Sequence, residues 1–194
     1  GEACRQAAAW RRGLPGAGAL RVSVNLSPSQ LDVPDAPQRV TTILEETGLD
    51  PRALVLEVTE SGVVADALTA AERLEVLSAL GVRIAVDDFG TGYASLLQLR
   101  RFPVHGLKMD RGFVAGMTSD PEDAAIVAAS VGLARALGLE TVAEGVETRQ
   151  QLDGLRGLGC QFAQGYLWSR PLPPADLERW WLEQAEAAYL QHLA

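Results

Sequence analysis

The sequence predicts an α/β fold in which strands and helices alternate around a parallel sheet. Strand-like apolar runs recur along the 194 residues, and runs of helical length separate them. A glycine stands between a helix and the next strand at Gly48, Gly81, Gly138 and Gly159. A helix, a glycine and an apolar strand repeated in this way favour βα units with right-handed crossovers, and therefore a parallel sheet.

The first part of the chain begins with a helix and then alternates strand and helix. Residues 2–12 form the end of a helix that stops at Gly13, and the alternating run 20–26 is a strand. Residues 35–47 carry apolar side chains at helical spacing, and we expect Gly48 to end that helix in a left-handed conformation. A strand at 54–58 follows, and apolar residues three apart predict a helix over 68–80.

The second part of the chain continues the same alternation. Strand 82–87 leads through a glycine-rich loop to a short helix at 94–101, and a brief strand at 107–109 follows. Helical segments then run to Gly138. The last elements are strand 139–143, a helix over 147–158, strand 160–164 and a long helix from Pro174 onward.

The strand count leaves two architectures open. We count about six strands, whereas a closed (β/α) barrel has about eight. The chain therefore forms either an open six-stranded α/β sheet or a barrel whose first two strands precede this sequence. Periodicity alone favours neither.

Composition excludes several classes of function. The net charge of −8 provides no basic stripe for the phosphates of a DNA or RNA polymer. The longest apolar stretch, 124–134, is too short to span a bilayer, and the first residues do not form a secretion signal. Cys4 and Cys160 lie far apart and form no CxxC pair, which fits a reducing cytoplasmic environment. We expect a cytoplasmic domain, in a parent protein that can itself be attached to a membrane.

Polar residues stand at the carboxyl ends of the predicted strands. They are Asn25, Glu57, Glu60, Asp87, Asp88, Lys108, Asp110, Glu144, Glu147 and Gln164. A buried parallel strand favours an unbroken apolar run, and a buried carboxylate costs several kcal/mol unless it is paired or bound to a metal. Because active sites of α/β folds form at this end of the sheet, we predict one here.

Some of these residues have a simpler interpretation. Glu60, Asp110 and Glu147 are equally well placed as N-caps or first-turn residues of the following helices. The adjacent pair Asp87 and Asp88 is harder to explain in this way, because neighbouring residues on a regular strand face opposite sides.

The chemistry expected at this end of the sheet is carboxylate chemistry. His105 and His192 are the only histidines, and neither has a neighbour that suggests a catalytic group. An oxygen-only set of carboxylates and an amide favours Mg²⁺ or Mn²⁺ over zinc or copper. Four or more carboxylates suggest two ions, which at about 3.5–4 Å apart can generate a nucleophile and bind a phosphoryl oxygen. Two divalent cations would turn an acidic cavity into a phosphate receptor.

Six short blocks resemble a known family. They are Val24-Asn-Leu-Ser27, Glu57-Val-Thr-Glu60, Asp87-Asp-Phe-Gly-Thr-Gly92, Lys108-Met-Asp110, Ala143-Glu-Gly-Val-Glu147 and Gln164-Gly-Tyr-Leu167. In this order they resemble the blocks of EAL domains, the phosphodiesterases that open the bacterial second messenger cyclic di-GMP. The resemblance implies a barrel of the TIM type and a hydrolase with two metal ions that yields linear pGpG.

The resemblance also assigns roles to the metal-binding and catalytic residues. It implies that Asn25, Glu57 and Asp87 bind one ion, and that Asp87 bridges to a second ion at Asp88. Lys108 would hold the attacking water and neutralise developing charge. Glu144 resembles either the general base or a ligand of the second ion, with Asp110 as its supporting neighbour.

Other residues would hold a loop or the substrate. The resemblance makes Glu60 and Glu147 anchors of loop 89–95, which in the family links metal binding to dimerisation, so a homodimer is expected. Gln164 would lie close to the ions. Tyr166 and Trp168 would wall the guanine pocket, although an aromatic residue near a strand end is more often simply part of the core.

The resemblance also sets the expected domain limits. Residues 1–173 would form an N-terminally incomplete EAL-type domain, and 174–194 a C-terminal helix that packs on the barrel. The Glu-Ala-Leu motif, with a metal-binding Glu and a substrate-binding Arg, is expected ahead of this sequence. Activity of this chain alone is then uncertain. The alternative function is an inactive cyclic di-GMP receptor or regulatory domain, and GGDEF or sensory domains are possible upstream.

Overall fold

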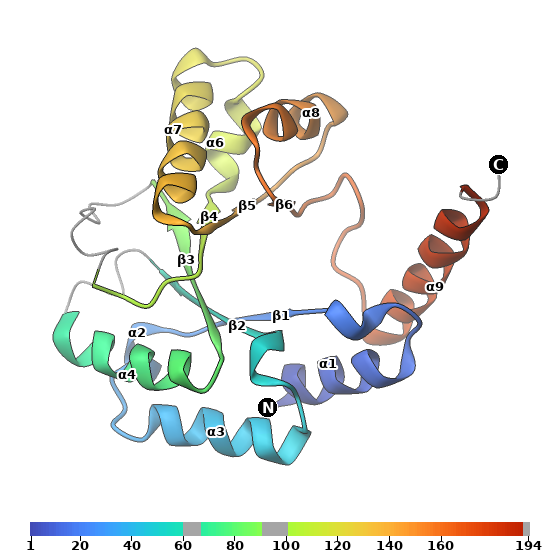
Figure 1. Ribbon diagram of the computed structural model, residues 1–194. Helices are drawn as coiled ribbons and strands as arrows, with labels where there is room; N and C mark the ends of the chain where they lie inside the picture. Colours follow the sequence, from blue (N-terminus) through green and yellow to red (C-terminus); the bar gives the residue numbers. More distant parts are fainter. Residues whose placement is uncertain (60–66, 91–100, 192–194) are drawn as a thin grey trace.

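The computed structural model describes residues 1–59, 67–90 and 101–191, and its centre is one curved parallel sheet (Figure 1). The strands are β1 (Val22–Asn25), β2 (Leu54–Thr59), β3 (Arg83–Phe89), β4 (Gly106–Met109), β5 (Glu140–Ala143) and β6 (Phe162–Ala163). The helices are α1 (Glu2–Gly13), α2 (Pro28–Leu31), α3 (Ala36–Thr47), α4 (Ala67–Ala79), α6 (Arg111–Gly116), α7 (Pro121–Leu137), α8 (Arg149–Leu158) and α9 (Pro174–Gln191). Short 3₁₀ turns lie at η1 (Ala17–Ala19) and η2 (Pro51–Ala53).

The order of the strands decides between the two architectures. The sheet runs β1-β2-β3-β4-β5-β6, and every neighbouring pair is parallel. A doubly wound sheet reverses its strand order at a switch point, whereas an order that never reverses keeps the connecting helices on one side and curls into a barrel. Figure 1 shows this arrangement: the sheet is C-shaped, its helices cover the convex side, and it is open between β1 and β6. Over the described residues the chain thus forms a six-stranded partial (β/α) barrel, as the family resemblance implied.

The register of β3 and β4 contains an irregularity that matters for the site. Ala85 and Val86 pair with Gly106 and Leu107, but the next pair is Phe89 with Met109. Three steps along β3 therefore match two steps along β4, which is a β-bulge. The bulge falls at Asp87 and Asp88 and changes the direction of their side chains.

Helix ends follow the local chemistry that the sequence predicts. Gly48, Gly81, Gly138 and Gly159 all have a positive φ, between 66° and 98°, in which a glycine has no Cβ clash. Thr148 begins α8 with a capping box: its hydroxyl accepts from the Gln151 amide, and the Gln151 side chain accepts from the amide of Thr148. The prediction that these glycines separate helices from strands is confirmed.

The core lies between the convex side of the sheet and the helices. One cluster packs α1, α3 and α4 on β1–β3 and includes Leu74, Leu77 and Ile84, all fully buried. Another packs α6, α7 and α8 on β4 and β5, around Val127 and Val146. Burial of an aliphatic side chain of this size stabilises the fold by about 1.5–3 kcal/mol. The concave side carries polar residues together with apolar ones such as Val55 and Val142.

The terminal helix α9 contacts the first helix of the chain. The Trp10 indole N–H donates to Glu178 Oε1 at 2.7 Å, and the Trp181 indole N–H donates to the carbonyl oxygen of Pro15 at 2.9 Å. These two bonds join the beginning of α9 to α1 and its following loop. The other end of α9 extends away from the sheet (Figure 1).

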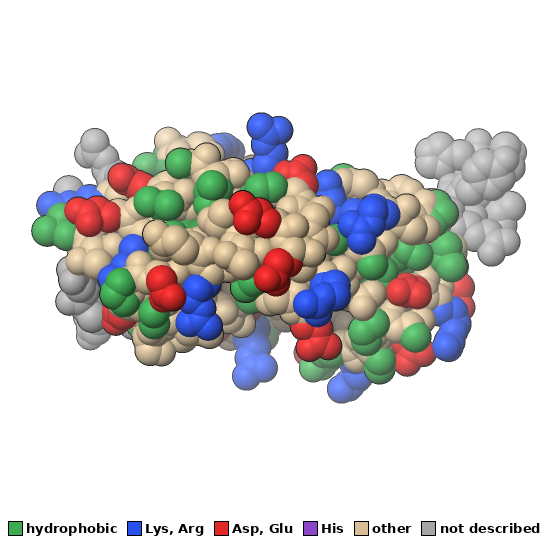
Figure 2. Space-filling model, turned by 90° about the horizontal axis from the view of Figure 1, so that it is seen from below, with side chains coloured by type: hydrophobic (Ala, Val, Ile, Leu, Met, Phe, Trp, Pro, Cys, Tyr) green, Lys and Arg blue, Asp and Glu red, His purple; other side chains and the backbone are tan. Residues whose placement is uncertain are grey.

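The outer surface is a mixture of charges. Viewed from the side of α3, acidic and basic side chains are interspersed with apolar ones (Figure 2). In the part of the chain that the structure describes, no helix is both long and apolar enough to cross a bilayer. Predicted helix 94–101 falls almost entirely outside the described residues, and the predicted strand 160–164 is shorter, at Phe162–Ala163.

Candidate active site

The candidate site is centred on one buried lysine. Lys108 lies on β4, and its Nζ is 2.8 Å from Glu57 Oε2, 2.9 Å from Asp87 Oδ1 and 2.5 Å from Glu144 Oε1. The three carboxylates come from β2, β3 and the residue after β5. Four parts of the chain that are distant in sequence therefore meet on the concave side of the sheet. The side chain of Lys108 is only 6% exposed.

The charge of Lys108 is maintained by these contacts. Burial by itself would lower the pKa of Lys108, because it removes water from the ammonium group. The hydrogen bonds to Glu144, Glu57 and Asp87 outweigh that effect, and the pKa is raised above its ordinary value. Lys108 is therefore an ammonium ion at neutral pH, and one positive charge faces three carboxylates.

Glu144 has a second partner on the neighbouring strand. Its Oε1 accepts a hydrogen bond of 2.9 Å from Nε2 of Gln164, which follows β6. Burial raises the pKa of Glu144, the hydrogen bond to Lys108 lowers it, and the net direction is upward. A positioned carboxylate with a raised pKa is suited to proton transfer.

The bulge places Asp87 and Asp88 on the same side of the sheet. Asp88 has φ 54°, in the left-handed region that non-glycine residues rarely adopt, and its amide donates to Asp87 Oδ1 at 3.1 Å. On a regular strand these neighbours would face opposite sides, so the bulge is what brings both carboxylates to the site. Burial and the charges of Asp87 and Asp110 raise the pKa of Asp88.

The donor set fits a hard divalent cation. Asp87, Asp88 and Glu144 each offer a carboxylate oxygen, and these atoms lie within 4.8 Å of one another. Ligand oxygens at about 2.0–2.6 Å from a common centre, as around Mg²⁺ or Ca²⁺, are compatible with that spacing. Glu57 lies next to this trio through Lys108, and Asn25 pairs with Glu57 in the β1–β2 ladder.

The remaining acidic residues of the predicted site are Asp110, Glu147 and Glu60, and of these Asp110 and Glu147 do not belong to the group of carboxylates that contact Lys108 in the described structure. Asp110 is the N-cap of α6, where its Oδ1 accepts from the Gly112 amide at 2.7 Å. Glu147 is exposed just before α8. Glu60 and most of loop 89–95 lie outside the described residues, so the structure describes no contact between Glu147 and that loop.

Tyr166 and Trp168 line a cavity beside the site. The cavity has a volume of about 730 Å³, and its wall also includes Arg111, Glu144 and Gln164. Tyr166 is 52% exposed and Trp168 42%, so neither ring is part of the core. The guanidinium of Arg170 lies 4.7 Å from the centre of the Tyr166 ring.

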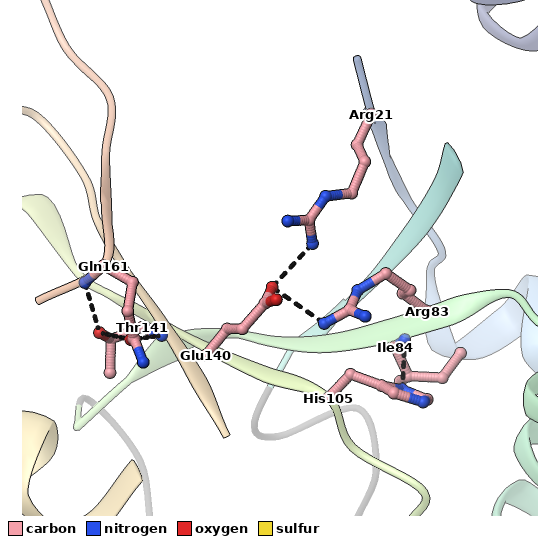
Figure 3. Close-up of polar contacts among 7 residues, drawn as sticks. All are labelled: Arg21, Arg83, Ile84, His105, Glu140, Thr141 and Gln161. Atoms are coloured by element: carbon pink, nitrogen blue, oxygen red, sulfur yellow. Dashed lines mark hydrogen bonds and ion pairs between the residues drawn. The ribbon is translucent and has the colours of Figure 1, made fainter. Parts of the chain in front are cut away.

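A polar layer that the sequence patterns did not predict lies nearer the amino ends of the strands (Figure 3). Glu140 Oε2 accepts from Arg21 at 2.7 Å and from Arg83 at 2.9 Å. The Arg21 guanidinium also lies 5.0 Å from the centre of the Phe162 ring. In the same view, Nδ1 of His105 accepts from the Ile84 amide at 3.1 Å. A cavity of about 430 Å³ lies between this layer and Glu57 and Lys108.

A signal for this layer was present in the sequence. Arg21, Arg83 and Glu140 stand four residues before Asn25, Asp87 and Glu144, along the predicted strands or directly beside their ends. Positions four apart on a strand share a face and lie about 13 Å apart. The spacing therefore places these charges on the concave side, one layer below the candidate site.

The comparisons with known proteins agree with this geometry. Residues 1–171 match the profile of the family described as EAL domain. The bifunctional diguanylate cyclase/cyclic di-GMP phosphodiesterase MucR of Pseudomonas aeruginosa is 48% identical over 176 residues, which are 91% of this chain and 25% of MucR. The solved structure of the MucR phosphodiesterase in complex with cyclic di-GMP has a TM-score of 0.86 to this chain. The match covers 91% of this chain and 70% of that structure.

Two further solved structures are similar. The EAL domain of Mycobacterium smegmatis DcpA is 41% identical, with a TM-score of 0.88, covering 94% of this chain and 81% of that one. The manganese/cyclic di-GMP complex of Klebsiella pneumoniae BlrP1 is 35% identical, with a TM-score of 0.77, covering 88% and 43%. This chain thus spans only a quarter of the length of MucR. The match over residues 1–171 shows that the chain belongs to the EAL domain family.

Proposed function

We propose that this chain carries the catalytic machinery of a phosphodiesterase that hydrolyses cyclic di-GMP to linear pGpG with two Mg²⁺ or Mn²⁺ ions. The observation that carries the proposal is the meeting of Glu57, Asp87 and Glu144 around Lys108. The relatives support the substrate and the kind of metal, since MucR is solved with cyclic di-GMP and BlrP1 with manganese and cyclic di-GMP.

The residues divide into ligands and proton-transfer groups. Asp87 and Asp88, with Glu57 and Asn25 beside them, would hold the ions, which supply Lewis-acid stabilisation of the phosphoryl oxygens. Lys108 neutralises charge that develops on the phosphate. Glu144, oriented by Gln164, would contribute one oxygen to an ion beside Asp87 and Asp88 and accepts the proton of the attacking water with the other. The new P–O bond forms as the bond to the 3′ oxygen breaks, and that oxygen takes up a proton.

The cavity beside the site suits a nucleotide base. Tyr166 and Trp168 offer exposed rings for stacking, and the cavity reaches Glu144 and Gln164. We assign them to one guanine of the substrate. Asp110 supports α6 next to Asp88, and Glu60 and Glu147 remain proposed as anchors of loop 89–95 and, through it, of a homodimer. A cytoplasmic location and upstream GGDEF or sensory domains in the parent protein belong to the same proposal.

The test is cyclic di-GMP hydrolysis by this chain and by its longer parent, with Mg²⁺ or Mn²⁺. Release of pGpG is measured by chromatography for the wild type and for Glu57→Gln and Asp87→Asn. Glu46→Gln and Asp153→Asn are matched controls, because these exposed carboxylates lie on α3 and α8, away from the site. Loss of turnover in the first pair alone is expected. If the parent binds cyclic di-GMP but cleaves it with neither ion, the enzyme assignment fails and a receptor takes its place.

A further inference from the structure

Lys108 is the only lysine in the 194 residues, although the chain has 17 basic residues in all. It is also the residue that joins the carboxylates of the candidate site, with three ion pairs of 2.5–2.9 Å. Without a cation among them, Glu57, Asp87 and Glu144 would repel one another in a poorly hydrated space. The ammonium of Lys108 therefore offsets the repulsion among these three carboxylates.

Two of the three carboxylates are also members of the candidate metal trio. Asp87 and Glu144 contact Lys108, and with Asp88 they bring oxygen atoms within 4.8 Å of one another. Asp87 Oδ1 and Glu144 Oε1 already accept further hydrogen bonds, from the Asp88 amide and from Gln164. A divalent cation at this trio would share its ligands with a positive charge only a few ångströms away.

We infer that Lys108 competes with divalent cations for Asp87 and Glu144, because its ammonium contacts the same carboxylates that would hold the ion. When a cation binds to the trio, repulsion moves the ammonium away from these carboxylates. Asp87 and Glu144 belong both to the trio that would bind the metal and to the carboxylates that contact Lys108. Metal occupancy therefore controls where the Lys108 side chain points. The ammonium becomes available to an anionic phosphodiester only when the metal site is filled. This inference rests on the proposed function, since it assumes that the trio binds the metal.

The single lysine makes the test direct. Chain labelled with ¹⁵N and ¹³C in lysine gives one side-chain ammonium signal, which belongs to Lys108, and Mg²⁺ is titrated in without nucleotide. We expect this signal to shift with saturation as the ion pairs to Asp87 and Glu144 are lost. Calorimetry measures Mg²⁺ and Mn²⁺ affinity in parallel for the wild type and for Lys108→Met.

The variant gives an independent prediction. Lys108→Met keeps a flexible side chain of similar length and removes the competing charge, so it should bind the divalent ion about tenfold more tightly than the wild type. In EDTA its thermal midpoint should be lower than that of the wild type, and the rise on adding Mn²⁺ should be larger. Arg156→Met removes an exposed cation on α8 that pairs with Asp153, and it should change neither quantity.

The outcomes separate the inference from the function on which it rests. If calorimetry shows metal binding while the Lys108 signal does not move, the inference is overturned and the proposed function stays intact. The same holds if Lys108→Met binds the metal no more tightly than the wild type. Failure of the wild-type chain to bind either ion would overturn the metal-dependent function and the inference together. If Lys108→Met does not fold, the lysine signal of the wild type decides.

Discussion

Gln164 donates a hydrogen bond from Nε2 to Oε1 of Glu144 at 2.9 Å. A residue that follows β6 thus orients the carboxylate that follows β5. The same oxygen contacts Lys108. Glu144 is therefore held from two sides, by groups that reach it only because β4, β5 and β6 are neighbours.

Replacement of Gln164 should slow the chemical step. Gln164→Leu keeps the approximate size of the side chain and removes the donor, so Glu144 loses one of two orienting contacts. We expect kcat to fall about tenfold, because a hydrogen bond to a charged group contributes about 1.5–3 kcal/mol. The free energy of unfolding should change little, since Gln164 is exposed.

The kinetics are measured as pGpG release by the hydrolytically active chain, with urea unfolding beside them. Gln38→Leu on α3 is the matched control, because it makes the same change at an exposed position away from the site. Equal activity of Gln164→Leu and the wild type would show that the contact does not orient the base.

Substitutions of Asp88 should change the free energy of unfolding according to whether the new residue tolerates a positive φ. Asp88→Val should lower the free energy of unfolding by about 1–2 kcal/mol, because a β-branched residue tolerates φ 54° poorly. Asp88→Asn should retain stability in EDTA, because Asn accepts this conformation and the repulsion from Asp87 and Asp110 is relieved. Urea unfolding in EDTA measures both variants. Equal stability of the Val and Asn variants would contradict the strained conformation.

Glu140 should contribute more to stability than either arginine that it binds. Glu140→Gln leaves Arg21 and Arg83 close together without their shared carboxylate, and we expect a loss of about 1 kcal/mol. Arg21→Gln alone should cost about half as much, because Arg83 still neutralises Glu140. The difference in unfolding free energy between the two variants should shrink as salt is added, since all three side chains are partly exposed. A loss for Arg21→Gln that matches or exceeds that of Glu140→Gln would contradict the sharing.

His105 should make stability fall on the acid side of neutrality. Burial and the charge of Arg83 lower the pKa of His105, and the opposing charge of Glu140 is the smaller effect. The unfolded chain then binds the proton more readily, so the free energy of unfolding declines as the pH falls from about 6.5 through the lower folded pKa. Protonation also removes Nδ1 as the acceptor for the Ile84 amide.

Urea unfolding between pH 5 and 8 checks this effect. In His105→Asn the side-chain amide oxygen can replace Nδ1 as the acceptor for the Ile84 amide. Because this amide does not titrate, the pH dependence that His105 causes should disappear. The only other histidine, His192, gives the matched control His192→Asn. An unchanged pH dependence in His105→Asn would show that other groups cause the acid-side loss.

Much of the fold follows from local patterns. Strand-like runs, helical spacing and the closing glycines depend on neighbours a few residues away, and Gly48, Gly81, Gly138 and Gly159 have the positive φ values that this chemistry requires. The position of Glu57, Lys108 and Glu144 on the carboxyl side of the sheet was predicted for the same reason. Parallel strands bring their carboxyl ends to one edge whatever their order.

The sequence by itself determined the βα repeat, the polar strand ends and an oxygen-only donor set. The tertiary structure decided the sequential strand order, the bulge that turns Asp87 and Asp88 to one side, and the contact of one lysine with three carboxylates. It also decided that Arg21 and Arg83 share Glu140. These features depend on register and on partners from distant strands. The alternation of a single strand does not contain that information, because a side chain's partner is set by the neighbouring strand against which it packs.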